Sequence, residues 1–194
     1  MNTLNRKEFL LQMMAASGLL MIPGIAPAFP ANSRRKLRMN FGLVTYQWGK
    51  DWDVPTMIDI LTRSQVLGVE LRVDHAHGVG PEISKERRKE IRKMFRNSPV
   101  EVLGMGTNQQ FDYPDQAKLR ESIERTKDYI ILSKDIGGSG VKVKPNQFHA
   151  GVPRSRTIEQ IGRALNQLAR IGASYGQQIR LEVHGNETQE IEVI

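Results

Sequence analysis

The chain has 194 residues, no cysteine and a formal net charge of +7 at neutral pH. Its hydrophobic content of 39% and charged content of 25% are typical of a globular domain, and they exclude a largely disordered chain or a membrane-embedded one. Without cysteine the chain has no disulfide, no thiolate nucleophile and no thiolate metal ligand. The positive charge permits an anionic partner such as a sugar phosphate or nucleic acid but does not establish one.

Residues 1–31 have the composition of an export signal. A short basic region with Arg6 and Lys7 precedes an apolar run over residues 9–25, and a small-residue stretch follows at Ala26-Pro27-Ala28. The basic region resembles a twin-arginine motif with lysine in the second position. Polar residues, glycine and proline interrupt the apolar run, which favours a cleaved signal over a permanent membrane span. We therefore expect a mature protein that starts near Asn32, is periplasmic or extracellular, and has no stable membrane span.

Residues 32–194 are expected to form one domain in which strands and helices alternate. Asp53 is the predicted N-cap of the first helix, with Pro55 in its first turn, and Gly68 and Gly176 are predicted to end helices. Strands are expected at residues 37–46, 69–74, 100–104, 141–144 and from 178 onward, and helices at 54–67, 84–97, 115–136 and 156–175.

Strands that are separated by single helices indicate a parallel sheet with right-handed crossovers. Either an open doubly wound sheet or a (β/α)8 barrel accepts this order. The first predicted strand is followed by Thr45-Tyr46-Gln47-Trp48-Gly49 rather than by a glycine-rich phosphate loop, which removes the main support for a dinucleotide-binding fold. The glycines at 137–140 precede a strand and are interpreted as a turn. The order therefore predicts the α/β class, and it leaves the open sheet without a dinucleotide site and the (β/α)8 barrel as the two architectures.

Polar residues gather where the predicted strands end. Glu182 and His184 are two residues apart on the last strand and so share one of its faces, with Glu182 suited to act as an oxygen ligand or a proton acceptor. His75 and His77 follow the second strand, and His149 follows the fourth. Active sites of parallel α/β folds lie at this edge, so we interpret these side chains as lining a catalytic face. The alternative is that they are ordinary solvated loop residues.

Charged and aromatic side chains add to this edge. Glu70 and Arg72 share one face of the second strand, where they are predicted either to form an internal ion pair or to contact a substrate. Lys142 and Lys144 share a face of the fourth strand, and an inward lysine suits an anionic or enediolate oxygen. Trp48 follows the first strand, where it could stack on a sugar or pack under a loop.

The strand at 68–73 with its continuation Asp74-His75-Ala76-His77-Gly78, together with the strand Arg180–Gly185, resembles the xylose isomerase-like barrel superfamily. This group includes sugar phosphate isomerases, epimerases and endonuclease IV. The resemblance implies a divalent metal at the barrel mouth, held by carboxylates and a histidine from later strands. Glu182 matches the glutamate that is both metal ligand and catalytic proton-transfer residue. The resemblance does not choose among Mn²⁺, Mg²⁺, Co²⁺ and Zn²⁺.

The resemblance also implies a role for a histidine after the second strand, since His75 or His77 would match a substrate-contacting histidine. His184, Lys144 and Trp48 complete the expected substrate-binding set because of their places at the strand ends. The substrate would be a small carbohydrate rather than nucleic acid.

A complete barrel of this type needs about 250 residues, and the pattern accounts for about five of its eight strand–helix units. We therefore expect a chain truncated after the fifth unit, without the remaining metal ligands and inactive alone, that pairs with a missing barrel half or with a second copy. A non-catalytic exported carbohydrate-binding module is the main alternative. A phosphodiesterase of the endonuclease IV type is less favoured, because an export signal argues against a DNA substrate.

Overall fold

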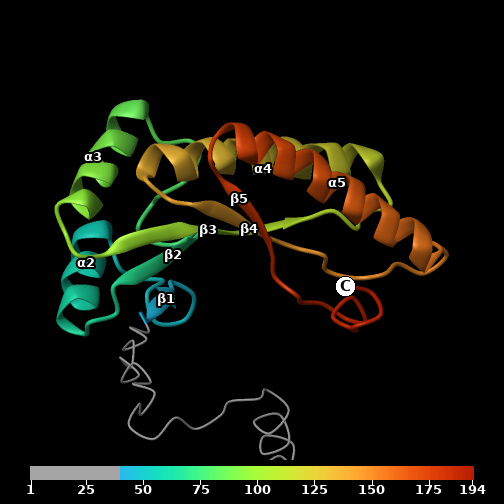
Figure 1. Ribbon diagram of the computed structural model, residues 1–194, viewed down its shortest axis with the longest axis horizontal. Helices are drawn as coiled ribbons and strands as arrows, with labels where there is room; N and C mark the ends of the chain where they lie inside the picture. Colours follow the sequence, from blue (N-terminus) through green and yellow to red (C-terminus); the bar gives the residue numbers. More distant parts are fainter. Residues whose placement is uncertain (1–39) are drawn as a thin grey trace, which may run out of the picture. The chain divides into compact units, whose positions relative to one another are not determined.

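The computed structural model describes residues 40–194, so the predicted export signal lies outside the described residues. The described part contains five parallel strands that pair in chain order, β1 to β5, with helices between them (Figure 1). The strands are β1 (Gly42–Val44), β2 (Gly68–Arg72), β3 (Glu101–Gln110), β4 (Gly140–Lys144) and β5 (Gln178–Leu181). The helices are α2 (Val54–Arg63), α3 (Lys85–Arg96), α4 (Gln116–Ile136) and α5 (Arg154–Ser174). The predicted α/β fold of partial barrel type is confirmed.

The two faces of the sheet differ in chemistry. Val69 and Leu71 on β2 and Val141 and Val143 on β4 are fully buried and belong to one apolar core with residues of α3, α4 and α5. The residues that alternate with them, among them Glu70 and Lys142, are partly buried. Because side chains alternate along a strand, these polar residues lie on the face away from the helices. The sheet therefore has a helix-covered apolar face and a polar inner face.

Most predicted helix ends are confirmed, with one exception. Asp53 caps α2 by accepting a hydrogen bond from the backbone N–H of Thr56 at 2.8 Å, and Gly137 ends α4 in the left-handed region at φ 93°. The prediction that Gly68 ends a helix was wrong. The helix ends at Arg63, Gln65 takes the left-handed turn at φ 58°, and Gly68 is the first residue of β2.

The third strand is longer than predicted, reaching Gln110 instead of residue 104. The strand continues because residues 104–106 pair with β2 and residues 105, 106 and 110 pair with β4, and both glycines lie at close approaches. The register with β2 shifts near Leu103, and Gly104 adopts φ 153° where a Cβ atom would overlap the carbonyl oxygen of Gly140. Glycine is thus required at position 104 by both conformation and space.

The first and last strands are shorter than predicted. Among the described residues β1 covers only Gly42–Val44, and β5 ends at Leu181. One further ladder bond follows β5, from the N–H of Glu182 to the carbonyl of Val143 at 2.9 Å. Glu182 therefore keeps its place beside β4, whereas the prediction that His184 lies on the strand was wrong.

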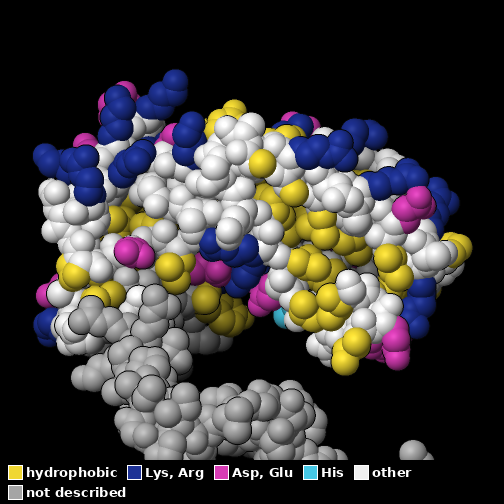
Figure 2. All heavy atoms as spheres, viewed as in Figure 1, with side chains coloured by type: hydrophobic (Ala, Val, Ile, Leu, Met, Phe, Trp, Pro, Cys, Tyr) yellow, Lys and Arg dark blue, Asp and Glu magenta, His cyan; other side chains and the backbone are white. Residues whose placement is uncertain are grey.

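Charged side chains cover the helical side. Figure 2 shows lysine and arginine gathered over α3 and along α5, and several belong to pairs with nearby carboxylates, such as Arg87 with Glu90 and Arg163 with Glu159. This is the expected surface of a solvated helix. Within residues 40–194, no helix has the length and apolar character needed to cross a bilayer.

Two glycine-to-alanine substitutions, one in β3 and one in α5, should change the stability of the fold in opposite directions. Gly104→Ala should lower the free energy of unfolding by about 1–3 kcal/mol, because alanine would be strained in conformation and would press on β4. Gly162, in the middle of α5, has no atom within 4 Å of a built Cβ. Gly162→Ala should therefore raise stability by about 1 kcal/mol. Chemical denaturation measures both, and equal effects would contradict the account.

Candidate active site at the carboxyl ends of the strands

A lysine between two glutamates is the most concentrated group of charges on the inner face. The ammonium nitrogen of Lys142 lies 2.8 Å from Oε1 of Glu70 and 3.2 Å from Oε2 of Glu182. The exposed fractions of the three side chains are 16%, 13% and 35% for Lys142, Glu70 and Glu182. One cation and two anions thus meet at one place, Glu70 coming from β2, Lys142 from β4 and Glu182 from the position directly after β5.

A glycine on the intervening strand makes this meeting possible. Gly106 of β3 lies between Arg72 of β2 and Lys142 of β4 in the strand register. A Cβ atom at Gly106 would stand 2.7 Å from Oε1 of Glu70, closer than real side chains allow. The missing side chain leaves the room in which Glu70 reaches across β3 to Lys142.

The electrostatics of the group follow from its burial. Burial acts to lower the pKa of Lys142, but the contacts with Glu70 and Glu182 outweigh it and hold the pKa above its ordinary value. Lys142 is therefore charged at neutral pH. Oε1 of Glu70 and Oε2 of Glu182 are buried, and the ammonium of Lys142 is their partner within residues 40–194. A carboxylate oxygen has two lone pairs, so each can also accept a proton or a ligand.

Arg72 takes a different partner from the one the sequence suggested. Its guanidinium donates to Oδ1 of Asn108 at 2.7 Å and lies over the ring of Tyr46, 4.9 Å from the centroid. The alternative of a Glu70–Arg72 ion pair is thus not realised, because Glu70 is paired with Lys142. Trp48, in the same loop as Tyr46, is 79% exposed. The loop after β1 presents aromatic surface to solvent.

The two histidines after β2 have different environments. His77 is 5% exposed; its Nε2 lies 2.8 Å from the carbonyl of Arg72, and its Nδ1 accepts the N–H of Val79 at 3.0 Å. These partners require the neutral tautomer with the proton on Nε2, and both nitrogens are used by the main chain. His75 is partly buried, 6.1 Å from His77 between ring centroids, and its Nδ1 has no partner in the described structure. His75 thus has a buried ring nitrogen without a partner, and His77 has none.

The remaining predicted residues lie near the same edge without joining the charged group. Lys144 is the last residue of β4 and is partly buried, and His184 is exposed in the segment after β5. That segment is tied to the β4–α5 loop by Thr188, whose hydroxyl donates to the carbonyl of Asn146 at 3.0 Å. No hydrogen bond or ion pair within residues 40–194 links Lys144, His184 or Trp48 to Glu182.

Sequence reasoning missed a buried aspartate at this edge. Oδ2 of Asp112 lies 2.8 Å from Nε2 of His149, and the aspartate side chain is fully buried whereas the histidine is 24% exposed. Asp112 follows β3, so the expectation that polar residues at strand ends line the site could have found it. Because β3 was predicted to end at Gly104, Asp112 was placed in a loop instead of at a strand end.

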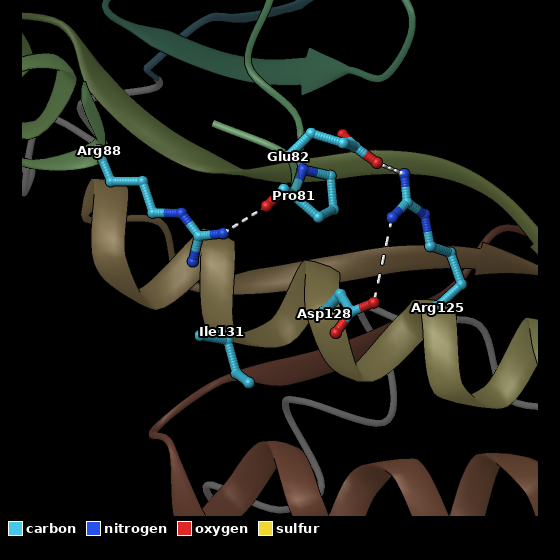
Figure 3. Close-up of a pocket in the computed structure, with 6 residues that line it drawn as sticks. All are labelled: Pro81, Glu82, Arg88, Arg125, Asp128 and Ile131. Carbon is cyan, nitrogen blue, oxygen red and sulfur yellow. Dashed lines mark hydrogen bonds and ion pairs between the residues drawn. The ribbon is translucent and has the colours of Figure 1, made fainter. Parts of the chain in front are cut away.

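A pocket of about 260 Å³ lies on the helical side, outside this edge (Figure 3). Arg88 of α3 and Arg125 of α4 enter it together with Glu82 and Asp128. Arg88 pairs with Asp135 at 2.9 Å and donates to the carbonyl of Pro81, while Arg125 pairs with Glu82. These charged groups are paired with one another. The pairs connect the loop before α3 with α3 and α4, and they leave no charged group of the pocket free for a ligand.

The described residues do not make a divalent metal site by themselves. Among residues 40–194, no three or more histidine, aspartate and glutamate side chains are grouped so that they could hold a metal ion. Glu182 offers one carboxylate, but the ammonium of Lys142 lies against it. Structural and catalytic metal sites usually take three or four protein ligands.

Comparison with known proteins agrees with the fold. A family model described as "Xylose isomerase-like TIM barrel" matches residues 61–192. No curated protein matches the chain.

Several solved structures superpose on the chain. Escherichia coli YcjR, a 3-keto-D-glucoside 4-epimerase, has a TM-score of 0.61 and 10% identity, over 74% of this chain and 56% of its own. D-psicose 3-epimerase from Clostridium cellulolyticum H10 has a TM-score of 0.65 and 14% identity, over 79% and 55%. A protein named IOLI, solved with a bound zinc atom, has a TM-score of 0.63 and 16% identity, over 74% and 51%. The chain spans about half the length of these structures, and such low identities establish the fold alone.

The buried histidine gives a pH prediction. Burial lowers the pKa of His77 from its ordinary 6.5, so protonation favours the unfolded chain. Its stabilising contribution is complete above pH 6.5 and declines as the pH falls from there toward the lowered folded-state pKa. We expect the melting temperature to fall between pH 7.5 and pH 5.5, and the fall to be smaller in His77→Gln. Parallel pH profiles for the two proteins would refute the assignment.

Proposed function

The chain belongs to the xylose isomerase-like TIM barrel family, and on that premise we propose that it serves the isomerisation or epimerisation of a sugar or sugar phosphate. The YcjR and D-psicose structures that share its fold are sugar epimerases. Because their sequence identity to this chain is low, the proposal is argued from the residues of the site.

The observation that supports it best is the placement of Glu182. Its carboxylate lies directly after β5, on the inner face, with Oε2 buried against the ammonium of Lys142. Isomerisation and epimerisation of a keto sugar begin with removal of a proton from the carbon beside the carbonyl. We propose that Glu182 is the catalytic group that accepts this proton. It would return the proton to the neighbouring carbon in an isomerisation, whereas in an epimerisation an acid on the opposite face of the sugar would supply the new one.

The surrounding groups have proposed roles in binding. The exposed ring of Trp48 suits stacking on the apolar face of a sugar. His75, Lys144 and His184 lie at the edge where a hydroxyl or phosphate would sit. His77 holds the His75 loop through the main chain, so we assign it a positioning role in place of direct contact.

A divalent metal, Mn²⁺, Mg²⁺, Co²⁺ or Zn²⁺, is the expected cofactor of the family, and the zinc-bound IOLI structure shares this fold. Residues 40–194 supply Glu182 as a single candidate ligand. The steps proposed here therefore do not pass through a metal. Because the family resemblance implies an ion held by several ligands and these residues supply one candidate, we expect the 194-residue chain alone to give no turnover. We further propose that residues 1–31 direct export and that residues 32–194 form the domain.

A carbohydrate-binding module without catalysis is the second candidate. The exposed aromatic side chains of the loop after β1, Trp48 at 79% and Tyr46 at 53%, favour it. Such a module would bind sugar whatever residue stands at position 182.

Solvent isotope exchange separates the two candidates. The protein expressed from its complete gene is incubated in D2O with D-fructose, D-psicose, D-tagatose and their phosphates. NMR follows the entry of deuterium at the carbon beside the carbonyl. We expect exchange with at least one ketose, and Glu182→Gln should reduce its rate about a hundredfold or more, because general base catalysis is worth that much.

Glu190→Gln is the matched control, since Glu190 is an exposed carboxylate in the same segment that pairs with Arg154. It should exchange at the wild-type rate. Sugar binding without any exchange would favour the module, and full exchange by Glu182→Gln would exclude Glu182 as the base.

A further inference from the structure

A histidine and a fully buried aspartate form a pair where β3 and β4 end. Asp112 follows β3, and His149 lies in the loop between β4 and α5. Oδ2 of Asp112 lies 2.8 Å from Nε2 of His149, and Oδ1 is buried without a partner within residues 40–194. Nε2 therefore carries the proton of this hydrogen bond. The other ring nitrogen, Nδ1, makes no hydrogen bond in the described structure, on a side chain that is 24% exposed.

Helix α5 holds the aspartate in place. The side-chain amide of Gln160 donates to the carbonyl oxygens of Phe111 and Tyr113, at 2.7 and 2.9 Å. These two residues stand directly before and after Asp112. The carboxylate is thus fixed at one position, where it keeps the imidazole in one tautomer and one orientation. A buried carboxylate in this position also stabilises the positive charge of a protonated ring, which suits the histidine to act as an acid and a base.

The loop that carries His149 is fastened to the segment that carries Glu182. The buried hydroxyl of Thr188 donates to the carbonyl oxygen of Asn146 at 3.0 Å. Gly185 passes so close to the same carbonyl that a Cβ atom would overlap it. The imidazole and the candidate base therefore belong to two chain segments that contact each other at the carboxyl ends of β4 and β5.

Arg154, the first residue of α5, makes a second link between these segments. Its guanidinium lies over the ring of Phe148, 4.5 Å from the centroid, and it pairs with Glu187 at 2.9 Å. Phe148 stands directly before His149, so this contact restrains the loop at the histidine itself.

The reaction proposed for Glu182 needs a second group that acts on the sugar oxygens. When the carbon beside the carbonyl loses its proton, the electron pair of the C–H bond forms a C–C double bond, and negative charge develops on the carbonyl oxygen. A proton given to this oxygen makes a neutral enediol. To complete an isomerisation, the hydroxyl on the neighbouring carbon must then lose its proton as the new carbonyl forms.

We propose that His149, positioned by Asp112, is the acid and base for these oxygens. Nδ1 of the protonated ring donates its proton to the carbonyl oxygen while Glu182 takes the proton from carbon. The same nitrogen then takes the proton of the neighbouring hydroxyl, while Glu182 gives its proton to the former carbonyl carbon. Both groups end as they began. The inference rests on the proposed function, from which it takes the role of Glu182.

Deuterium exchange into a ketose, catalysed by the protein expressed from its complete gene, tests this inference. His149→Ala should slow the exchange about a hundredfold or more, as is usual for loss of a general acid and base. Added imidazole can act in the space left by the side chain, and it should raise the rate of His149→Ala about tenfold or more. It should not accelerate the wild type.

Asp112→Asn should slow the exchange about tenfold or more, because an amide can donate to Nε2 and so hold the ring in the wrong tautomer. In a protein that already carries His149→Ala it should change the rate less than about threefold, since Asp112 acts through the histidine. Asp59→Asn is the matched control. Asp59 is an exposed aspartate of α2 that pairs with Arg63, and its variant should exchange at the wild-type rate.

The possible outcomes separate this inference from the proposed function. Exchange that is lost in Glu182→Gln but kept in His149→Ala would overturn the inference and leave the proposed function standing. A loss in folded His149→Ala that imidazole does not restore would also overturn it, because the pair would then only fasten the loop. If circular dichroism shows His149→Ala to be unfolded, a wild-type rate in Asp112→Asn would overturn it instead. No exchange by the wild type would refute both.

Discussion

The contact of one ammonium with two carboxylates on the inner face is the interaction on which the strand ends depend. Each of these charges is half-buried or more, and an unpaired charge in such a place costs several kcal/mol. Lys142 avoids this cost for Glu70 and Glu182 together. It also links side chains of β2, β4 and the segment after β5, which carries the candidate base.

The backbone is adapted to this contact at two glycines of the strand between them. Gly106 leaves space for Glu70 to reach Lys142, and Gly104 lets β3 lie close to β4. Meanwhile the opposite face of the same strands packs Val69, Leu71 and Val141 against the helices. The sheet thus separates its two tasks by the alternation of side chains: apolar residues hold the fold, and polar residues are presented for chemistry.

Periodicity was enough to predict the alternating strands and helices, the parallel sheet and the placement of Glu182, because these follow from local patterns. The length of β3 and the role of Gly68 were not predictable, since both depend on what the neighbouring strands bring near. The same limit applies to the site. A strand pattern places Glu70 and Lys142 on the inner face, but only the register shows that they meet across Gly106. Asp112 was missed because an error in one strand end carried over to the residue after it.

Proton transfer by Glu182 and charge balance by Lys142 both require that the Lys142 contacts are energetically real. A double-mutant cycle of Glu70→Gln and Lys142→Met, measured by chemical denaturation, tests this most directly. The account predicts a coupling free energy of about 1–3 kcal/mol between the two positions. Effects that add to within about 0.5 kcal/mol would contradict it.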